Sequence, residues 1–294
     1  MIIEAQTICI LTGWKMIQDN CTPCWLWKGR KGENIMRETV LITGASGGIG
    51  KEFACVFAEH GFDLVLAART EKKLQSLADD LHKRFGVSVT VIPSDLSKAD
   101  GAETLYKKVC ELGIKIDQLV NNAGVGKKGR VVDSDLQTLI DIMTLNISSV
   151  TLLCRLFGAD MVKRGYGKIL NVSSLGAFIP DPGFNVYGPS KAFELFLTEA
   201  MEGELHGTGV SVSALCPGTT KTGWAANAGK ADSKTAGNPR KVAEIGFRKM
   251  QKGRLVIIPS MLFRAEKAAV SLLPVKLRIR CIARWQSGLM NKKS

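Results

Sequence analysis

The stretch Thr43-Gly44-Ala45-Ser46-Gly47-Gly48-Ile49-Gly50 follows a short apolar run, ETVLIT (38–43), and leads into a segment of helical period, 50–60. Glycines at such a junction allow a tight turn. They also let a pyrophosphate reach the amide donors of the helix N-terminus, where the helix dipole favours anions. The spacing is GxxxGxG rather than the commoner GxGxxG. The stretch therefore predicts a dinucleotide-binding turn, with a plain strand-to-helix turn as the alternative.

Downstream of this stretch, short β-branched runs alternate with longer segments of helical period, a pattern typical of a parallel sheet covered on both faces. The segments expected to form strands are 38–43, 63–68, 87–93, 116–121, 168–173, 209–215 and 254–259. Segments such as 50–60 and 72–85 have helical period. The sequence predicts one doubly wound α/β domain, over 37–262, with a seven-stranded parallel sheet.

Composition excludes several classes of protein. The chain has 294 residues, of which 45% are hydrophobic and 23% charged, an ordinary globular composition that rules out a disordered or fibrous protein. No apolar run approaches the roughly 20 residues of a spanning helix. The first ten residues contain Glu4 and no Lys or Arg, unlike a secretory signal. We expect a cytoplasmic protein.

The net charge of +13 is concentrated at the C-terminal end. Residues 1–220 carry 23 Lys and Arg against 24 Asp and Glu, a net of −1, whereas residues 221–294 carry 17 against 3, a net of +14. The tail, 263–294, alternates apolar and basic residues and predicts a helix packed on the domain or on a dimer partner. The alternative is peripheral contact with an anionic membrane surface. A nucleic-acid partner is not expected, since no recognised binding motif is present.

Two further segments depart from the α/β pattern. Residues 1–36 hold three of the five tryptophans and lack a clear period, and Met36 directly precedes the first strand. We favour a start-site artefact over a small accessory extension. The CxxC pair in this segment, Cys21 and Cys24, lacks a second pair or histidines at zinc spacing, so no metal site is expected. The stretch TTKTGWAANAGKADSKTAGNP (219–239) is too long for an ordinary connection and predicts a mobile lid.

The second strand indicates which dinucleotide binds. Sites for NAD generally end this strand in an acidic residue that bonds the ribose hydroxyls, whereas a basic residue accommodates the 2′-phosphate of NADP. Here the strand ends Ala67-Ala68-Arg69, without an acid. NADP is therefore expected and NAD is less favoured, and a solvated arginine at a strand end is the alternative.

A second group of residues points to proton transfer. Tyr187 lies thirteen residues after Ser174, and Lys191 follows four residues after the tyrosine. Positions four apart on a helix share a face, so Tyr187 and Lys191 can point into one cleft. A nearby ammonium is expected to lower the pKa of the tyrosine from about 10 toward the working range of a general acid and base.

These motifs, in this order and spacing, resemble the short-chain dehydrogenase/reductase family over about residues 37–260. The motifs are TGASGGIG (43–50), Asp95 in SDL, NNAG (121–124), Asn146 in TLN, NVSS (171–174), YGPSK (187–191) and PGTTKT (217–222). The runs VSVSALCPGTTKTGW and RLVIIPSMLFRAEKAAVSLLP are most similar to the DltE-type branch. The resemblance implies a Rossmann-type domain with seven parallel strands. We also expect a homo-oligomer and a small-molecule carbonyl or alcohol substrate.

The resemblance also implies a catalytic tetrad of Asn146, Ser174, Tyr187 and Lys191. Tyr187 would exchange a proton with the substrate oxygen, Ser174 would bond that oxygen, Lys191 would hold the nicotinamide ribose and Asn146 would position a water. The residues that would bind the cofactor are Gly44, Ser46, Gly48, Ile49, Gly50, Arg69, Asp95, Asn122, Gly124, Tyr187, Lys191, Pro217, Gly218 and Thr222. Gly47 occupies the position at which many NADP-using members have a second basic residue. Arg69 is therefore left nearly alone to bind the 2′-phosphate.

The expected activity is NADP-dependent hydride transfer between nicotinamide and a carbonyl or secondary alcohol, with Tyr187 as general acid and base. The alternative is a dinucleotide-binding regulatory or scaffold protein without turnover. The pairing of Tyr187 with Lys191 argues against that alternative, because a protein that only binds has no need for it.

Overall fold

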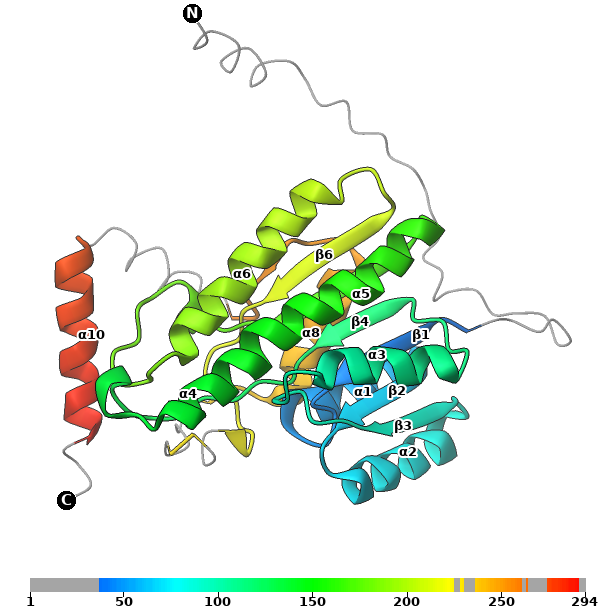
Figure 1. The fold of residues 1–294 in the computed structure, drawn as a ribbon, viewed down its shortest axis with the longest axis horizontal. Helices are drawn as coiled ribbons and strands as arrows, with labels where there is room; N and C mark the ends of the chain where they lie inside the picture. The colour runs from blue at the N-terminus through cyan, green and yellow to red at the C-terminus, as the bar shows by residue number, and fades with distance from the viewer. Residues whose placement is uncertain (1–36, 225–227, 230–235, 261–262, 264–273, 291–294) are drawn as a thin grey trace, which may run out of the picture. The chain divides into compact units, whose positions relative to one another are not determined.

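The computed structural model describes residues 37–224, 228–229, 236–260, 263 and 274–290 (Figure 1). Several sequence predictions fall outside these residues. They are the N-terminal segment 1–36 with its Cys21–Cys24 pair, parts of the expected lid (225–227 and 230–235), and parts of the basic tail (264–273 and 291–294).

A seven-stranded parallel sheet forms the centre of the molecule, as predicted. Its strands are β1 (Thr39–Thr43), β2 (Asp63–Ala68), β3 (Val89–Pro93), β4 (Gln118–Asn121), β5 (Gly167–Val172), β6 (Val210–Leu215) and β7 (Val256–Ile257). They lie in the order β3-β2-β1-β4-β5-β6-β7. All seven predicted strands are confirmed, with small differences at their ends. The largest is at β7, which pairs with β6 through only two residues, Val256 and Ile257.

Helices cover both faces of this sheet (Figure 1). The helices are α1 (Gly48–Glu59), α2 (Glu71–Phe85), α3 (Gly101–Glu111), α4 (Leu136–Met143), α5 (Ser149–Arg164), α6 (Tyr187–Glu204), α8 (Pro239–Gln251) and α10 (Val275–Met290). Alternate strand residues point to opposite faces. Val40 and Ile42 of β1 therefore pack in the core with Phe57 of α1, whereas Leu41 packs in the core with Phe157 of α5.

A long helix runs from Leu136 to Arg164 through α4, a π-helical turn η3 (Thr144–Ser148) and α5. By length and composition alone it could cross a membrane, since an 18-residue stretch has a mean hydropathy of 1.5. Its residues Leu153, Phe157 and Met161 are buried in the domain core. Packing within the domain therefore accounts for these apolar positions.

The strand order places the loops after β1 and β4 side by side, at the point where the connections reverse direction along the sheet. Open α/β sheets bind ligands at such a switch point, outside the carboxyl ends of the strands. The backbone amides of Asn122 and Ala123, just after β4, both donate to Thr43 Oγ1 at 3.0 Å. The end of β4 is thereby fastened to the start of the glycine turn.

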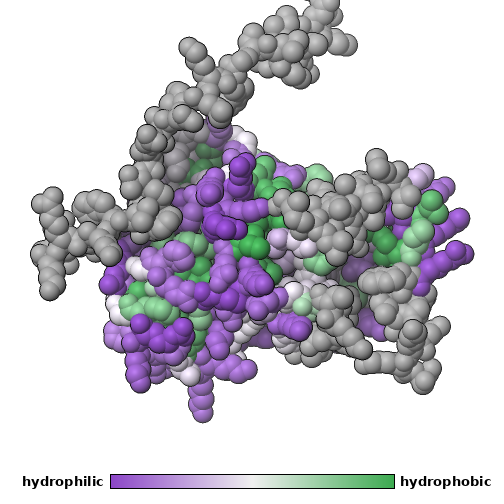
Figure 2. Space-filling view, turned by 180° about the vertical axis from the view of Figure 1, so that it is seen from behind, coloured by the Kyte–Doolittle hydropathy of each residue, from purple (hydrophilic) through white to green (hydrophobic). Residues whose placement is uncertain are grey.

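The described surface is mixed in character. Figure 2 shows mainly hydrophilic side chains with apolar patches between them. The most exposed large apolar residues include Val132, Leu136 and Phe196, which are 83%, 72% and 69% exposed. In the tail, α10 exposes Val275 and Leu277 as well as basic residues.

Candidate active site

The glycine turn adopts a backbone that its sequence requires. Gly44 and Gly48 have φ of +65° and +55°. These values lie in the left-handed region, which residues other than glycine rarely adopt. A Cβ at Gly44 would lie 2.9 Å from Ala123 Cα, and one at Gly50 would collide with the carbonyl oxygen of Gly44. At Gly44 and Gly50 the turn is thus packed too closely for a side chain. Ser46 is half-buried within it, and Ile49 packs against the core.

Asn122 ties this turn to the sheet. Its Nδ2 donates to the carbonyl oxygens of Thr43 at 3.0 Å and Gly44 at 3.3 Å. The resemblance placed Asn122 in the wall beside the adenine ribose. In the structure its amide holds the glycine turn in position.

Arg69 and Asp95 lie at the ends of neighbouring strands. Arg69 follows β2 and is exposed, and Asp95 follows β3 and is half-buried. Asp95 Oδ1 accepts from Ser97 Oγ at 2.7 Å and from Ser97 N at 3.1 Å. These bonds, with a smaller contribution from the charge of Arg69, lower the pKa of Asp95. One acidic and one basic side chain therefore stand together beyond the sheet edge.

The structure brings the four residues of the predicted tetrad to one region. Tyr187 is the first residue of α6 and Lys191 lies one turn later, while Asn146 belongs to the π-helical turn η3. Ser174 precedes the short helix η4 (Leu175–Ala177), where its Oγ accepts from Gly176 N at 3.1 Å. Ser174 also acts on the phenol of Tyr187, where it lowers the pKa.

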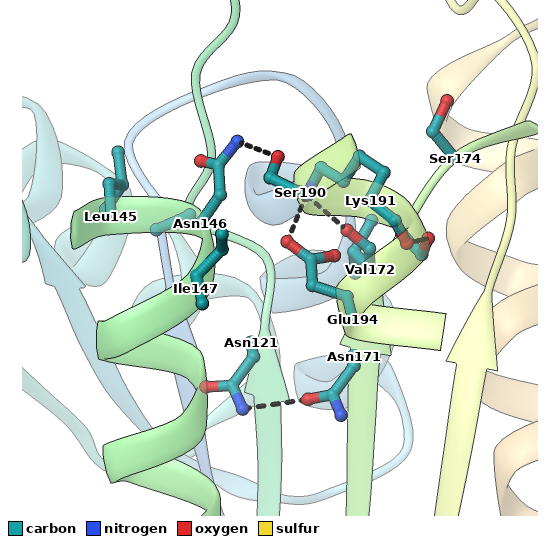
Figure 3. Close-up of polar contacts among 12 residues, drawn as sticks. Asn121, Leu145, Asn146, Ile147, Asn171, Val172, Ser174, Ser190, Lys191 and Glu194 are labelled. Atoms are coloured by element: carbon teal, nitrogen blue, oxygen red, sulfur yellow. Dashed lines mark hydrogen bonds and ion pairs between the residues drawn. The ribbon is translucent and has the colours of Figure 1, made fainter. Parts of the chain in front are cut away.

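Asn146 is fully buried and fixed by three hydrogen bonds. Its Nδ2 donates to Val125 O at 2.8 Å and to Ser190 Oγ at 2.9 Å, and its Oδ1 accepts from Val125 N at 3.0 Å. π-helical turns are rare and occur frequently at functional sites. Here the turn carries Asn146 against α6 (Figure 3).

Lys191 makes contacts that the sequence did not predict. Its Nζ donates to Glu194 Oε1 at 2.7 Å and to Val172 O at 2.9 Å (Figure 3), and it lies 6.0 Å from the centroid of the Tyr187 ring. Sequence reasoning missed Glu194, although it lies only three residues beyond the lysine. Neighbouring Ser173, which does not have the family spacing to the tyrosine, donates its hydroxyl to Lys191 O at 2.7 Å.

The expected lowering of the tyrosine pKa is wrong for this structure. Burial raises the pKa of Tyr187 above its ordinary value, and the opposite effect of Ser174 offsets this only in part. The nearby charges of Glu194 and Asp181 raise the pKa further. In the protein without ligands, the phenol of Tyr187 is therefore held in its protonated form.

Trp224 is a second residue that sequence reasoning missed. Its ring contacts that of Tyr187, with centroids 4.8 Å apart, and a Cβ at Gly126 would lie 2.8 Å from both rings. Trp224 belongs to the stretch predicted as a lid, and its place there, directly after the PGTTKT motif, was the available signal. A tryptophan and a bare glycine backbone thus flank the half-buried Tyr187.

The PGTTKT motif reaches the glycine turn from β6. The methyl group of Thr222 lies 3.2 Å from where a Cβ of Gly48 would be, and Pro217 O accepts from Leu175 N at 3.0 Å. Gly218 packs directly against the ring of Phe263, a contact that the sequence did not predict.

A glycine also lies directly against the proton-transfer residues. A Cβ at Gly124 would lie 3.1 Å from Lys191 Nζ and 3.4 Å from Asn146 Oδ1. Without a side chain at this position, the backbone lies bare next to an ammonium at the carboxyl ends of the strands. The residues present therefore fit a nicotinamide dinucleotide, with the glycine turn suited to its pyrophosphate and Lys191 suited to a ribose.

Comparison with known proteins agrees with this geometry. The chain matches the short chain dehydrogenase family over residues 38–233. The probable oxidoreductase EphD of Mycobacterium bovis is 34% identical over 192 residues, which make up 65% of this chain and 32% of that protein. The chain therefore spans only about a third of that relative.

Solved structures match over more of their length. A short-chain dehydrogenase from Sphingobium yanoikuyae in complex with NADPH is 31% identical, with a TM-score of 0.72, and the match covers 87% of this chain and 96% of that one. A short chain dehydrogenase/reductase from Burkholderia phymatum in complex with NAD is 26% identical, with a TM-score of 0.72 and coverage of 79% and 92%. The DltE-type branch stays a prediction. The family match, the sheet order and the grouping of Asn146, Ser174, Tyr187 and Lys191 lead to one conclusion: the chain belongs to the short-chain dehydrogenase/reductase family.

Proposed function

We propose that the protein is an NADP-dependent oxidoreductase that transfers hydride between nicotinamide and a carbonyl or secondary alcohol. The observation that carries this proposal is the position of Tyr187. Ser174 acts on the phenol of Tyr187 and lowers its pKa, and Lys191 lies one turn along the same helix, beside the bare backbone of Gly124. A proton donor, an oxygen-binding hydroxyl and a cation are the groups that carbonyl reduction requires.

The cofactor, when bound, supplies or accepts the hydride. In reduction, Tyr187 gives its phenolic proton to the substrate oxygen, and Ser174 donates a hydrogen bond to the same oxygen. Burial suits Tyr187 to this step, because it keeps the phenol protonated until the substrate oxygen develops negative charge. In oxidation, the phenolate takes the proton from the alcohol. Trp224 and Gly126 cover the ring of Tyr187 and restrict access of water to it.

NADP is favoured over NAD by the end of β2. Arg69 is exposed there, and Ala68 provides no carboxylate to repel a 2′-phosphate. The Sphingobium yanoikuyae protein binds NADPH and the Burkholderia phymatum protein binds NAD, so the family as a whole accepts both. The choice in this chain therefore rests on Arg69.

The test of this function is a screen of carbonyl compounds by NADPH consumption, followed by the variant Tyr187→Phe. Loss of the hydroxyl is expected to lower kcat at least about 100-fold, the usual contribution of a positioned acid or base, while the Kd of NADPH changes little. Tyr166→Phe is the matched control, because Tyr166 lies outside the site and its hydroxyl donates to Glu38.

Turnover of Tyr187→Phe within a few-fold of the parent would contradict the proposed role. Binding of NADPH with no turnover on any compound of the screen would instead favour the alternative function, a dinucleotide-binding regulatory or scaffold protein.

Two partner proposals stay predictions. A homo-oligomer is supported by α6, which exposes 69% of Phe196 and 38% of Phe193. Peripheral contact with an anionic membrane surface is supported by α10, where exposed Val275 and Leu277 alternate with basic residues. The substrate is proposed as a small carbonyl compound or alcohol.

A further inference from the structure

A buried carboxylate lies behind the proton-transfer residues. Glu194 follows Lys191 by three residues on α6, and the two side chains are 1% and 5% exposed. Glu194 Oε1 accepts from Lys191 Nζ at 2.7 Å, and Val172 O accepts from the same ammonium at 2.9 Å (Figure 3). An ammonium has three donors. Two of the three donors of Lys191 are therefore engaged within the protein, which leaves one for a ligand.

The surroundings of Glu194 give its carboxylate little other support. Oε2 has no hydrogen-bond partner among the residues that the structure describes. A neighbouring polar chain contacts only the backbone of Glu194, since Thr198 Oγ1 donates to Glu194 O at 2.7 Å and accepts from Asn171 Nδ2 at 2.9 Å. Asn171 in turn accepts from Asn121 Nδ2 at 2.9 Å (Figure 3).

Such an ion pair is a poor stabilising device. Removing two charges from water costs several kcal/mol per ion, and an apolar pair of similar volume is often as stable or more stable. Burial raises the pKa of Glu194 to about 7, against the opposite effect of Lys191. A contribution to stability therefore does not explain a carboxylate at this position.

The charges around Glu194 connect it to the reacting phenol. Lys191 is its ion-pair partner on α6, and Tyr187, also on α6, has its pKa raised by the charge of Glu194. Asp181, before α6, acts on Tyr187 in the same direction. The charge of Glu194 also raises the pKa of the Cys154 thiol on α5. Burial has the larger effect and raises this pKa to about 12, so the thiol stays neutral.

We propose that Glu194 is a positioning residue, which holds the ammonium of Lys191 against β5 and offsets its charge toward Tyr187, and so sets the pH range in which Tyr187 exchanges protons. This inference rests on the proposed function. Without the carboxylate, the full charge of Lys191 would act on the phenol and favour the phenolate. With it, the phenol keeps its proton to higher pH, which favours the reduction of a carbonyl.

The test replaces the carboxylate by an amide of the same shape, Glu194→Gln. Loss of the negative charge favours the phenolate. The rise of kcat/KM with pH in the oxidation direction should therefore move to lower pH by roughly one unit, as expected for a nearby charge. The phenolate absorption of the NADP-bound protein, taken as the difference from Tyr187→Phe, should move in the same direction. Glu199→Gln is the matched control, since it removes an exposed carboxylate from the same helix.

Profiles of Glu194→Gln that coincide with those of the parent and of Glu199→Gln in both measurements would overturn the inference. If Glu194→Gln does not fold, Glu194→Met is measured instead, with the same expected shift. Failure of both variants to fold would show a structural role and would also overturn it. The phenolate measurement needs no turnover, so a failure of the proposed function is seen separately, as activity that survives in Tyr187→Phe.

Discussion

Arg69 is the residue on which the proposed preference for NADP rests. A guanidinium facing a 2′-phosphate makes charge-assisted hydrogen bonds, each contributing roughly 1.5–3 kcal/mol. We therefore expect the Kd of NADPH to be at least about tenfold lower than that of NADH. The double variant Ala68→Asp with Arg69→Ala should reverse this order, because the new carboxylate repels the phosphate and accepts from the ribose hydroxyls of NAD.

Isothermal titration of both nucleotides measures the effect. Lys83→Ala, which removes an exposed cation near the far end of α2, is the control and should leave both affinities unchanged. Equal affinities of the parent for NADPH and NADH, or an order that the double variant does not alter, would show that Arg69 does not face the nucleotide.

Among individual residues, those that belong to a sequence motif could be predicted, whereas those that join the site only through packing could not. The spacing of Ser174, Tyr187 and Lys191 was sufficient to group them. In the sequence, Glu194 resembles any carboxylate that lies near a lysine on a helix. No local pattern indicates that both side chains are buried. The position of Trp224 against Tyr187 depends on the path of a loop, which hydrophobic period does not determine.

Among the elements, the turn into α1 offers the sharpest test. A Cβ at Gly50 would collide with Gly44 O and with the side-chain amide of Asn122, so Gly50→Ala must displace the turn. Overpacking of this kind typically costs about 1–3 kcal/mol of unfolding free energy. We expect a lower Tm and weaker NADPH binding, measured by thermal denaturation with and without the nucleotide.

Gly203→Ala provides the matched control for this variant. Gly203 lies in α6 with open space where its Cβ would be, and alanine is the better helix former. Its Tm should be equal to that of the parent or slightly higher. A Tm and nucleotide affinity of Gly50→Ala equal to those of the control would show that the turn adapts to a side chain.

The elements themselves were largely predictable. Strands β1 to β7 follow from apolar β-branched runs, because a sheet covered on both faces buries both sides of each strand. The ends were less predictable: β7 shortens to Val256 and Ile257, where pairing with β6 decides the limits. The π-helical turn around Asn146 could not be predicted, since one widened turn barely changes the hydrophobic period of the long helix.

For the whole molecule, the testable expectation concerns the first 35 residues. The sheet, the glycine turn and the proton-transfer residues all lie after Met36. We therefore expect a shortened chain that begins at Met36 to fold, bind NADPH and turn over as the full chain does. Circular dichroism, nucleotide affinity and kcat/KM compare the two chains. An insoluble or inactive shortened chain would show that residues 1–35 are structural.

The position of β1 between β2 and β4 also bears on how the protein is made. During synthesis, β2 emerges soon after β1 and can pair with it through a local crossover, and β3 can then pair with β2. The second neighbour of β1, which is β4, is complete only at Asn121. A nascent chain of that length already contains the glycine turn, Arg69 and Asp95. Asn146 and Tyr187 have yet to be added. The half expected to bind the nucleotide is therefore synthesised before the residues expected to act on the substrate.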